Sequence, residues 1–280
     1  MKIYAVCLVK NEVDVIRQSL VHASKYCERM YVLDNGSSDG TWEAVVSLSA
    51  ENERVVPFGR TPVPFDNNLR GVVYDAIHSQ LSDDDWWLLL DADEFLAEDP
   101  RPVIAEAVSI GADVINAWQA LFYFTDVDLR SYEAGEDSRN RPIVERRRYY
   151  RIDEQERRIF QNRVSGDWSQ SSLLQRRKKC PRRIMNRHYR YRDPLQMTSR
   201  LDVRFGHPAF ATQVWTRDFK KLIWSSRRLT LRNDGEPWRF TASGMLAYAM
   251  SWLRPINRRI RQSIAKRLAT PLKRFGLTAR

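Results

Sequence analysis

The stretch Trp86–Leu96, Trp-Trp-Leu-Leu-Leu-Asp-Ala-Asp-Glu-Phe-Leu, constrains the fold more than any other. Its five leading apolar residues run without a polar break into the carboxylates of Asp91, Asp93 and Glu94. A short, continuous apolar run predicts a strand buried on both faces, as in the middle of a parallel sheet. Open α/β sheets bind ligands at the carboxyl ends of such strands. We therefore expect an α/β fold with an acidic site at this strand end.

The spacing of the acidic residues points to a particular kind of site. In an extended segment Asp91 and Asp93 would point the same way, because side chains alternate with a period of two. Two like charges repel unless a cation or a hydrogen-bonded ligand lies between them. Hard oxygen ligands suit Mg²⁺ or Mn²⁺ shared with nucleotide phosphates, which is the functional interpretation. The alternative is a solvated acidic loop after a core strand.

Length, cysteine content and hydropathy limit the class of protein. The 280 residues suffice for one large α/β domain, or for one domain with an appendage. Three cysteines without metal-type spacing indicate neither a disulfide framework nor a zinc site, and they favour a reducing compartment. The apolar run Ile3–Val9 is too short for a signal peptide and predicts a first strand. No apolar run approaches the roughly 18 residues that span a bilayer, so we expect a cytoplasmic location.

The net charge of +11 belongs mainly to the C-terminal part of the chain. Residues 237–280 carry ten Lys or Arg and no Asp or Glu, whereas the rest has 36 basic and 35 acidic residues. Apolar residues recur there at steps of four between basic ones, which is typical of a basic amphipathic helix: Ile256, Ile260, Ile264 and Leu268. We predict a body of residues 1–236 and a segment 237–280 that attaches to an anionic membrane surface. The alternative is a tail that packs on its own domain or on a partner. The nearly neutral body is not expected to bind nucleic acid.

Strands and helices alternate in the first half of the chain. The first strand is followed by a helical apolar stripe, and Met30–Leu33 predicts a second strand. In the turn-rich octet Asp34–Thr41, Ser38 or Asp39 can cap the next helix. This order is typical of a parallel α/β sheet. Further along we expect helices at Val72–Leu81 and Pro100–Gly111 and a strand at Asp113–Phe124. The segments between and after them are expected to be an irregular connection at Phe58–Asn68, a solvated loop at Ser82–Asp85 and a polar loop at Asp126–Arg151.

Three motifs together resemble the family 2 glycosyltransferases of the GT-A fold. They are Val-Lys-Asn-Glu after the first strand, Leu-Asp-Asn-Gly-Ser-Ser-Asp-Gly-Thr after the second, and Leu-Leu-Asp-Ala-Asp-Glu-Phe after a later one. The resemblance implies a mostly parallel central sheet flanked by helices, here with a basic helical extension. It also implies inverting transfer of a sugar from a UDP-, dTDP- or GDP-sugar to a glycan or glycolipid hydroxyl, with Mn²⁺ or Mg²⁺. Such relatives most often act in cell-surface polysaccharide or lipopolysaccharide assembly.

The resemblance also implies roles for individual residues. Glu12 and Asp34 would hold the base and ribose of the donor, since carboxylates accept bonds from N–H groups and hydroxyls. Asp91 is expected near the ribose, or on the metal through water, and Asp93 is expected to bind the metal directly. Arg70 would pair with the diphosphate. The alternative for Arg70 is a surface arginine in the first helical turn.

An inverting transfer needs a group that takes the proton of the acceptor hydroxyl. Asp167 lies where the family usually supplies this base, although the usual Glu-Asp pair is absent. The alternatives are Asp126, Asp128 and Glu94.

A late histidine completes the metal shell in many GT-A enzymes. His188 is the candidate, with His207 as second choice, and imidazole suits Mn²⁺ better than Mg²⁺. Its neighbours Arg187, Arg190 and Arg192 are expected either to neutralise the departing nucleoside diphosphate or to lie on the surface.

Two other function classes make different predictions. A nucleotidyltransferase of similar fold would carry a Gly-rich, basic phosphate loop after the first strand, whereas Lys10-Asn11-Glu12 contains no glycine. A non-catalytic membrane- or nucleic-acid-binding protein would show tail-dependent binding with a steep salt slope. That class leaves the acidic strand ends unexplained.

Overall fold

The computed structural model describes residues 1–163, 177–205, 218–241 and 245. Its strands are β1 (Ile3–Val9), β2 (Arg29–Asp34), β3 (Val55–Arg60), β4 (Trp86–Leu90), β5 (Glu94–Leu96), β6 (Val114–Phe122), β7 (Tyr149–Gln161), β8 (Ile184–His188) and β9 (Thr230–Leu231). Its helices are α1 (Ile16–Ala23), α2 (Thr41–Glu51), α3 (Leu69–Ile77), α4 (Arg101–Ser109), α5 (Asp126–Glu133), α6 (Ile143–Arg146) and α7 (Pro194–Phe205). The 3-10 turns are η1 (His78–Gln80), η3 (Phe219–Leu222) and η4 (Ser226–Arg228).

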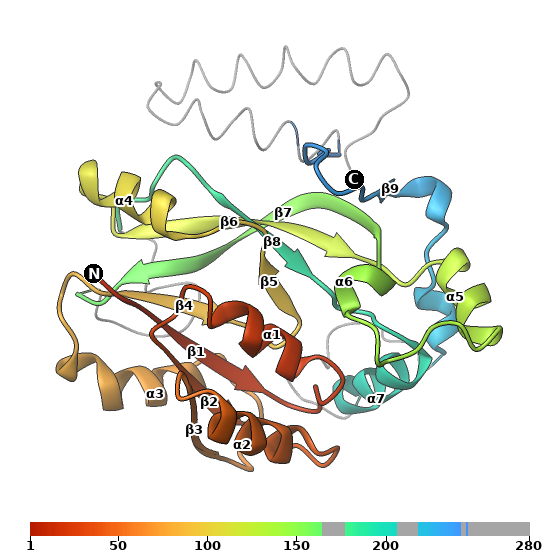
Figure 1. Cartoon of the computed structure of the whole chain (residues 1–280), viewed down its shortest axis with the longest axis horizontal. Coiled ribbons are helices and arrows are strands. Elements are labelled where there is room, and N and C mark those ends of the chain that lie inside the picture. Colours follow the sequence, from red (N-terminus) through yellow and green to blue (C-terminus); the bar gives the residue numbers. More distant parts are fainter. Residues whose placement is uncertain (164–176, 206–217, 242–244, 246–280) are drawn as a thin grey trace.

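One sheet runs through the described residues (Figure 1). Its strand order is β3-β2-β1-β4-β7-β6-β8-β5, with β9 paired to β7. The first four strands in this order pair in parallel, whereas β7 runs antiparallel to both β4 and β6. The predicted α/β fold, with a central sheet flanked by helices, is confirmed.

The two faces of β1 and β4 belong to different cores. Odd-numbered residues of β1 join a core that α1, α2 and α4 cover, and its even-numbered residues join a second core under α3. In β4, Trp86 lies in the first core and Trp87 in the second, and both side chains are completely buried. The continuous apolar run therefore marks a strand buried on both faces, as the sequence predicts.

The parallel register brings the ends of β1, β2 and β4 to one edge of the sheet. Val9 pairs with Asp34, and Cys7 pairs with Leu90. The loops after β1 and β2 are tied together, because the Glu12 N–H donates to Thr41 Oγ1 at 2.8 Å. Polar residues that follow these strands in the sequence are thereby placed on the same side of the molecule.

The later strands bring a distant histidine to the same edge. β5 pairs antiparallel with β8, and this register places Glu94 opposite His188. The backbone N–H of Tyr189 donates to the carbonyl of Asp93 at 2.8 Å. The end of β8 therefore lies beside the acidic turn that follows β4.

Several local predictions were wrong. Asp126–Arg151 is not a polar loop: it forms α5, α6 and the start of β7, and a capping box between Thr125 and Asp128 opens α5. The predicted irregular connection Phe58–Asn68 begins within β3. β3 lies at the edge of the sheet, and an edge strand tolerates Pro57, which has no backbone N–H to donate to a second neighbouring strand.

Helix α3 starts earlier and ends earlier than the predicted Val72–Leu81. The loop before β4 is only partly solvated, because Asp85 is buried and accepts the backbone N–H of Lys2 at 2.7 Å.

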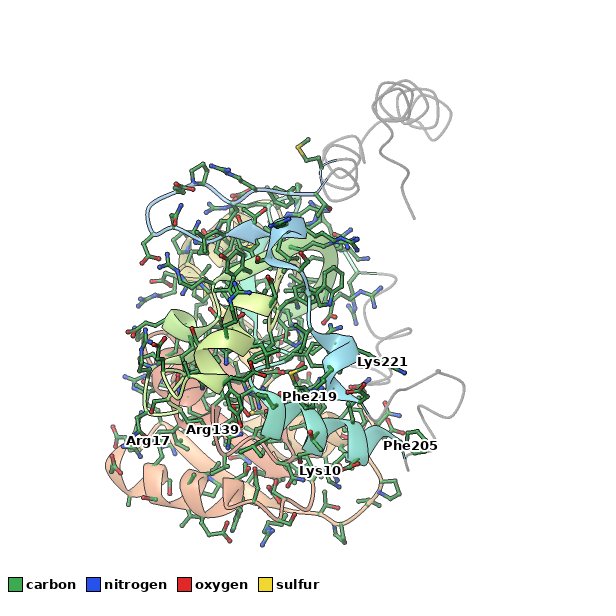
Figure 2. All side chains as sticks on the ribbon, turned by 90° about the vertical axis from the view of Figure 1, so that its right-hand side faces the viewer. Lys10, Arg17, Arg139, Phe205, Phe219 and Lys221 are labelled. Atoms are coloured by element: carbon green, nitrogen blue, oxygen red, sulfur yellow. The ribbon has the colours of Figure 1, made fainter. Side chains whose placement is uncertain are left out.

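The C-terminal described residues pack on the second half of the sheet. Figure 2 shows α7 and η3 side by side, with Phe205 and Phe219 labelled. Trp238 and Phe240, in the predicted 237–280 segment, pack against the core that contains Trp118. The predicted amphipathic stripe lies outside the described residues. Among the helices that are described, none is long and apolar enough to cross a membrane.

Candidate functional site

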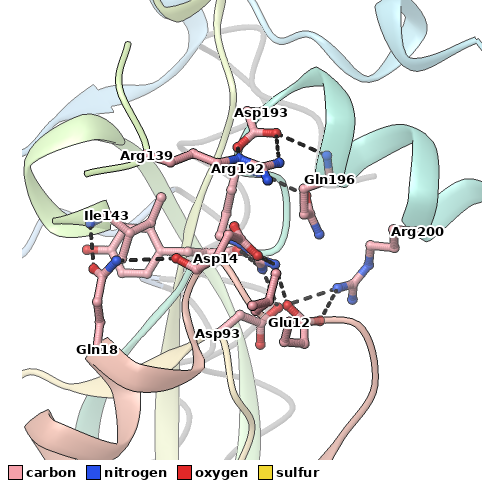
Figure 3. Close-up of polar contacts among 12 residues, drawn as sticks. Glu12, Asp14, Gln18, Asp93, Arg139, Ile143, Arg192, Asp193, Gln196 and Arg200 are labelled. Atoms are coloured by element: carbon pink, nitrogen blue, oxygen red, sulfur yellow. Dashed lines mark hydrogen bonds and ion pairs between the residues drawn. The ribbon is translucent and has the colours of Figure 1, made fainter. Parts of the chain in front are cut away.

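Glu12, Asp93 and His188 follow or end three different strands and come together in one cluster. His188 Nε2 lies 3.4 Å from Asp93 Oδ2. Arg200 Nη1, from α7, lies 3.4 Å from Asp93 Oδ2 and 3.6 Å from Glu12 Oε1. Figure 3 shows Glu12 and Asp93 close together, with the Arg200 guanidinium reaching them from α7. Arg192 Nη1 also lies 3.7 Å from Asp93 Oδ2, so the two carboxylates share the positive charges of Arg200 and Arg192.

Arg192 forms the fixed part of this cluster. Its buried guanidinium donates to both oxygens of Asp14, at 2.6 and 2.9 Å, and also pairs with Glu12. Burial raises the pKa of Glu12 to about 7, and the charge of Arg192 opposes that shift. Burial would also raise the pKa of Asp93, but His188, Arg200 and Arg192 together hold it well below its usual value. Asp93 is therefore an anion around which positive charge gathers.

Asp91 is held from two sides by arginines. One carboxylate oxygen accepts from Arg70 and the other from Arg158 Nη1 at 3.1 Å. Burial opposes ionisation, yet these two cations keep the pKa of Asp91 below its usual value. Arg70 is itself buried and also contacts Asn67, so it is not a surface arginine. The Asp91 side chain remains 27% exposed, which leaves one edge open to a ligand.

The prediction that Asp91 and Asp93 point the same way from an extended segment was wrong. Strand β4 ends at Leu90, and the Glu94 N–H donates to the Asp91 carbonyl at 3.0 Å, closing a turn. Asp91 consequently meets Arg70 and Arg158, whereas Asp93 meets His188.

Asp34 is the last residue of β2, and its side chain bonds to the turn that follows this strand. The side chain is fully buried, and its Oδ1 accepts the backbone N–H groups of Gly36 at 3.0 Å and Ser37 at 2.9 Å. Arg60 Nε donates to the same oxygen at 3.2 Å. Oδ2 has no hydrogen-bond partner among the described residues. Asp39 accepts the backbone N–H of Thr41 at 3.0 Å, but the N-cap of α2 is Gly40, so the predicted cap at Ser38 or Asp39 was wrong by one or two positions.

The residues considered for the proton-accepting role lie in different places. Asp126 accepts the backbone N–H of Ser226, and Asp128 caps α5. Glu94 is buried with Arg158 against its carboxylate, and burial raises its pKa well above the usual value. Asp167 and the second-choice His207 lie outside the described residues.

The donor atoms around Asp93 fit a divalent cation that also binds phosphate. With 3.4 Å between Asp93 Oδ2 and His188 Nε2, one ion can lie about 2.1 Å from both. His188 Nδ1 has no hydrogen-bond partner among the described residues and lies 3.5 Å from Glu94 Oε1, so a small approach of the two would let this carboxylate accept the Nδ1–H and leave Nε2 available. Within the described residues no group of three His, Cys, Asp or Glu side chains could hold a metal alone. Phosphate oxygens and water would have to complete the shell.

Two residues of this cluster, Asp14 and Arg200, are not identified by sequence reasoning. A partial signal exists for Arg200, since Gln196 and Arg200 are four residues apart within α7 and share one face of the helix. Gln196 Oε1 accepts the backbone N–H of Arg192, which precedes the helix, at 3.1 Å. The first turn of α7 is thereby attached to the buried arginine, and Arg200 follows one turn later. No comparable signal marks Asp14.

No protein-family model and no curated protein matches the chain. Among solved structures, the chain is similar to the mannosyltransferase PcManGT from Pyrobaculum calidifontis, in complex with GDP-Man and Mn²⁺. That similarity has 11% identity and a TM-score of 0.40, over 97% of this chain and 80% of that one. A structure described as a glucose-1-phosphate thymidylyltransferase from Bacillus anthracis, in complex with a sucrose, has 13% identity and a TM-score of 0.31, over 42% of this chain and 55% of that one.

Proposed function

We propose that this protein is a glycosyltransferase that moves a sugar from a nucleotide-sugar to a hydroxyl acceptor. One observation carries the proposal: Glu12, Asp93 and His188, from the ends of separate strands, converge on a position that attracts a cation. The carboxyl edge of a parallel sheet is where α/β proteins bind nucleotides. The motifs around Glu12 and Asp93 resemble those of family 2 glycosyltransferases, and this resemblance supports the same function.

Each side chain has a role in this proposal. Asp93 and His188 would hold Mn²⁺ or Mg²⁺, which supplies positive charge against the departing nucleoside diphosphate. Asp91, fixed by two arginines, offers its open edge to a ribose hydroxyl. Glu12 is proposed to contact the nucleoside, and Asp34 would do so through Oδ2, the oxygen that its turn does not use.

The proton of the acceptor hydroxyl is proposed to go to Asp167, giving inversion at the anomeric carbon. Glu94 fits a different task, since its carboxylate lies against Arg158 and faces the ring nitrogen of His188. We propose that Glu94 orients His188 and does not contact the acceptor.

The test is a panel of UDP-, dTDP- and GDP-sugars, assayed for binding and hydrolysis with Mn²⁺ or Mg²⁺. We expect at least one donor to give a metal-dependent signal with the wild type and none with Asp93→Ala. Asp75→Ala, which removes an exposed carboxylate of α3, is the matched control and should behave as wild type. A metal-dependent signal that survives in Asp93→Ala would contradict the proposal.

We further propose that residues 237–280 attach this enzyme to an anionic membrane surface, where a glycan or glycolipid acceptor of cell-surface polysaccharide or lipopolysaccharide assembly is carried. Each basic residue near the lipid contributes about 1 kcal/mol. Co-sedimentation with liposomes should therefore retain the full chain and lose a chain that stops near Gly244. Equal retention of both would rule this attachment out.

A further inference from the structure

Among the described residues, four arginines contact Glu12, Asp91 or Asp93, and they are not held equally. Arg70, Arg158 and Arg192 have at most 7% of their side chains exposed, and each makes at least one short contact with a carboxylate. Arg200 is 20% exposed, and its shortest carboxylate contact, 3.4 Å to Asp93, is longer than the shortest carboxylate contact of each of the other three. It is therefore the cation that the site can release at the lowest cost.

The hydrogen bonding of Arg200 is incomplete. The approach of Nη1 to Asp93 at 3.4 Å is a long hydrogen bond, and its 3.6 Å separation from Glu12 is too long to be one. Its Nε is buried and has no hydrogen-bond partner among the described residues. A guanidinium carries five donors in a planar fork, so most of its bonding capacity is available here. An anion with several acceptor oxygens would satisfy it.

The charge balance explains why this guanidinium lies where it does. Glu12, Asp14 and Asp93 bring three carboxylates to the cluster, and Arg192 alone cannot neutralise them. Arg200 supplies a second positive charge between Glu12 and Asp93. A divalent cation bound at Asp93 would replace that charge, and the guanidinium would then be free to pair with phosphate oxygens in the bidentate geometry it prefers.

We propose that Arg200 is a phosphate-binding residue of the donor site, and that its guanidinium leaves the gap between Glu12 and Asp93 when metal and nucleoside diphosphate bind. This inference rests on the proposed function. Gln196 attaches the first turn of α7 to Arg192, so the helix holds Arg200 one turn beyond a fixed point. The movement required is then a change of side-chain rotamer within reach of Asp93.

The first test measures binding of UDP, GDP and dTDP to the full chain by titration calorimetry in the presence of Mn²⁺. Losing a charge-assisted bond to phosphate should weaken the binding of Arg200→Gln by about 10- to 100-fold. Arg200→Lys keeps the charge without the fork, should be intermediate, and serves if the glutamine variant does not fold. Arg130→Gln, on an exposed arginine of α5, is the matched control and should bind as wild type.

The second test measures Mn²⁺ binding without nucleotide, by electron paramagnetic resonance. Because Arg200 competes for Asp93, its removal should tighten Mn²⁺ binding severalfold. Unchanged affinity of Arg200→Gln for both the nucleotide and Mn²⁺ would overturn the assignment of Arg200 while leaving the transferase proposal intact. Failure of the wild type itself to bind any of UDP, GDP and dTDP would overturn both.

Discussion

Arg192 and Asp14, 178 residues apart in the chain, form a buried two-bond ion pair. The Arg192 side chain is fully buried and that of Asp14 is 4% exposed. Through this pair the loop before α1 is joined to the segment between β8 and α7. The same guanidinium contacts Glu12, so the pair also fixes one wall of the candidate site.

Replacing Arg192 should strongly destabilise the fold. Arg192→Ala leaves Asp14 and Glu12 buried without their counter-charge, which costs about 3–5 kcal/mol of the free energy of unfolding. Urea titration followed by circular dichroism measures this loss. Arg17→Ala, at an exposed pair with Glu51, should change the free energy of unfolding much less, because solvent screens an exposed ion pair. Similar losses for both variants would show that the buried pair contributes no more to the free energy of unfolding than the exposed pair does.

Glu94 should influence metal binding without touching the metal. If its carboxylate fixes the tautomer of His188, Glu94→Gln should lower Mn²⁺ affinity about tenfold or more. Glu156 pairs with the same Arg158 but has no recorded contact with His188, so Glu156→Gln should keep wild-type affinity. Isothermal titration of both variants compares them. Equal Mn²⁺ affinities of the two variants would show that Glu94 acts only as an ion-pair partner of Arg158.

Acid should weaken the fold partly through Asp193. Burial alone would raise the pKa of Asp193, but hydrogen bonds, led by those from Arg139, outweigh this and leave it below its usual value. The folded state therefore holds this proton less tightly than the unfolded chain. Its stabilising contribution is complete above about pH 4 and is lost as the pH falls towards the lower folded pKa.

The measurement is Tm by circular dichroism between pH 7 and pH 3. Asp193→Asn should have a lower Tm than wild type at pH 7 and a smaller further decrease on acidification. Asp202→Asn, at an exposed position of α7, should follow the wild-type curve. A decrease in Asp193→Asn as steep as in wild type would assign the acid sensitivity to other carboxylates.

The three cysteines should be inert in the folded protein. Cys7, Cys27 and Cys180 are buried free thiols, and burial raises the pKa of each above its usual value. Thiolates react with disulfide reagents, and thiols do not. Absorbance with a chromogenic disulfide at pH 8 should therefore register no rapid reaction until denaturant unfolds the chain. Rapid labelling of any thiol in the native state would contradict this placement.

Local signals were sufficient for β1, β2 and β4 but not for β3, which overlaps the predicted irregular connection. The apolar runs of β1, β2 and β4 are bounded by polar turn residues, and the structure places these strands where the sequence predicts them. A strand buried on both faces leaves a continuous apolar run, which can be read without knowledge of its neighbours. The polar region after Thr125 was predicted to be a loop, but the capping box of Thr125 and Asp128 starts a helix there.

Tertiary contacts decide which partner each acidic side chain has. Asp34 and Glu12 both follow strands of the same parallel sheet, yet Asp34 accepts backbone N–H groups of its own turn while Glu12 meets an arginine 180 residues away. Backbone N–H groups and a guanidinium can both donate to a carboxylate, so residue type alone does not choose between them.

The sequence by itself determined which strands are buried and that acidic groups follow them, because hydrophobic burial acts through the local pattern of residues. Only the tertiary structure decided that Asp93 meets His188 and Arg200, while Asp91 meets Arg70 and Arg158. Charge pairing depends on distances between elements far apart in the chain, and those distances exist only once the sheet has assembled.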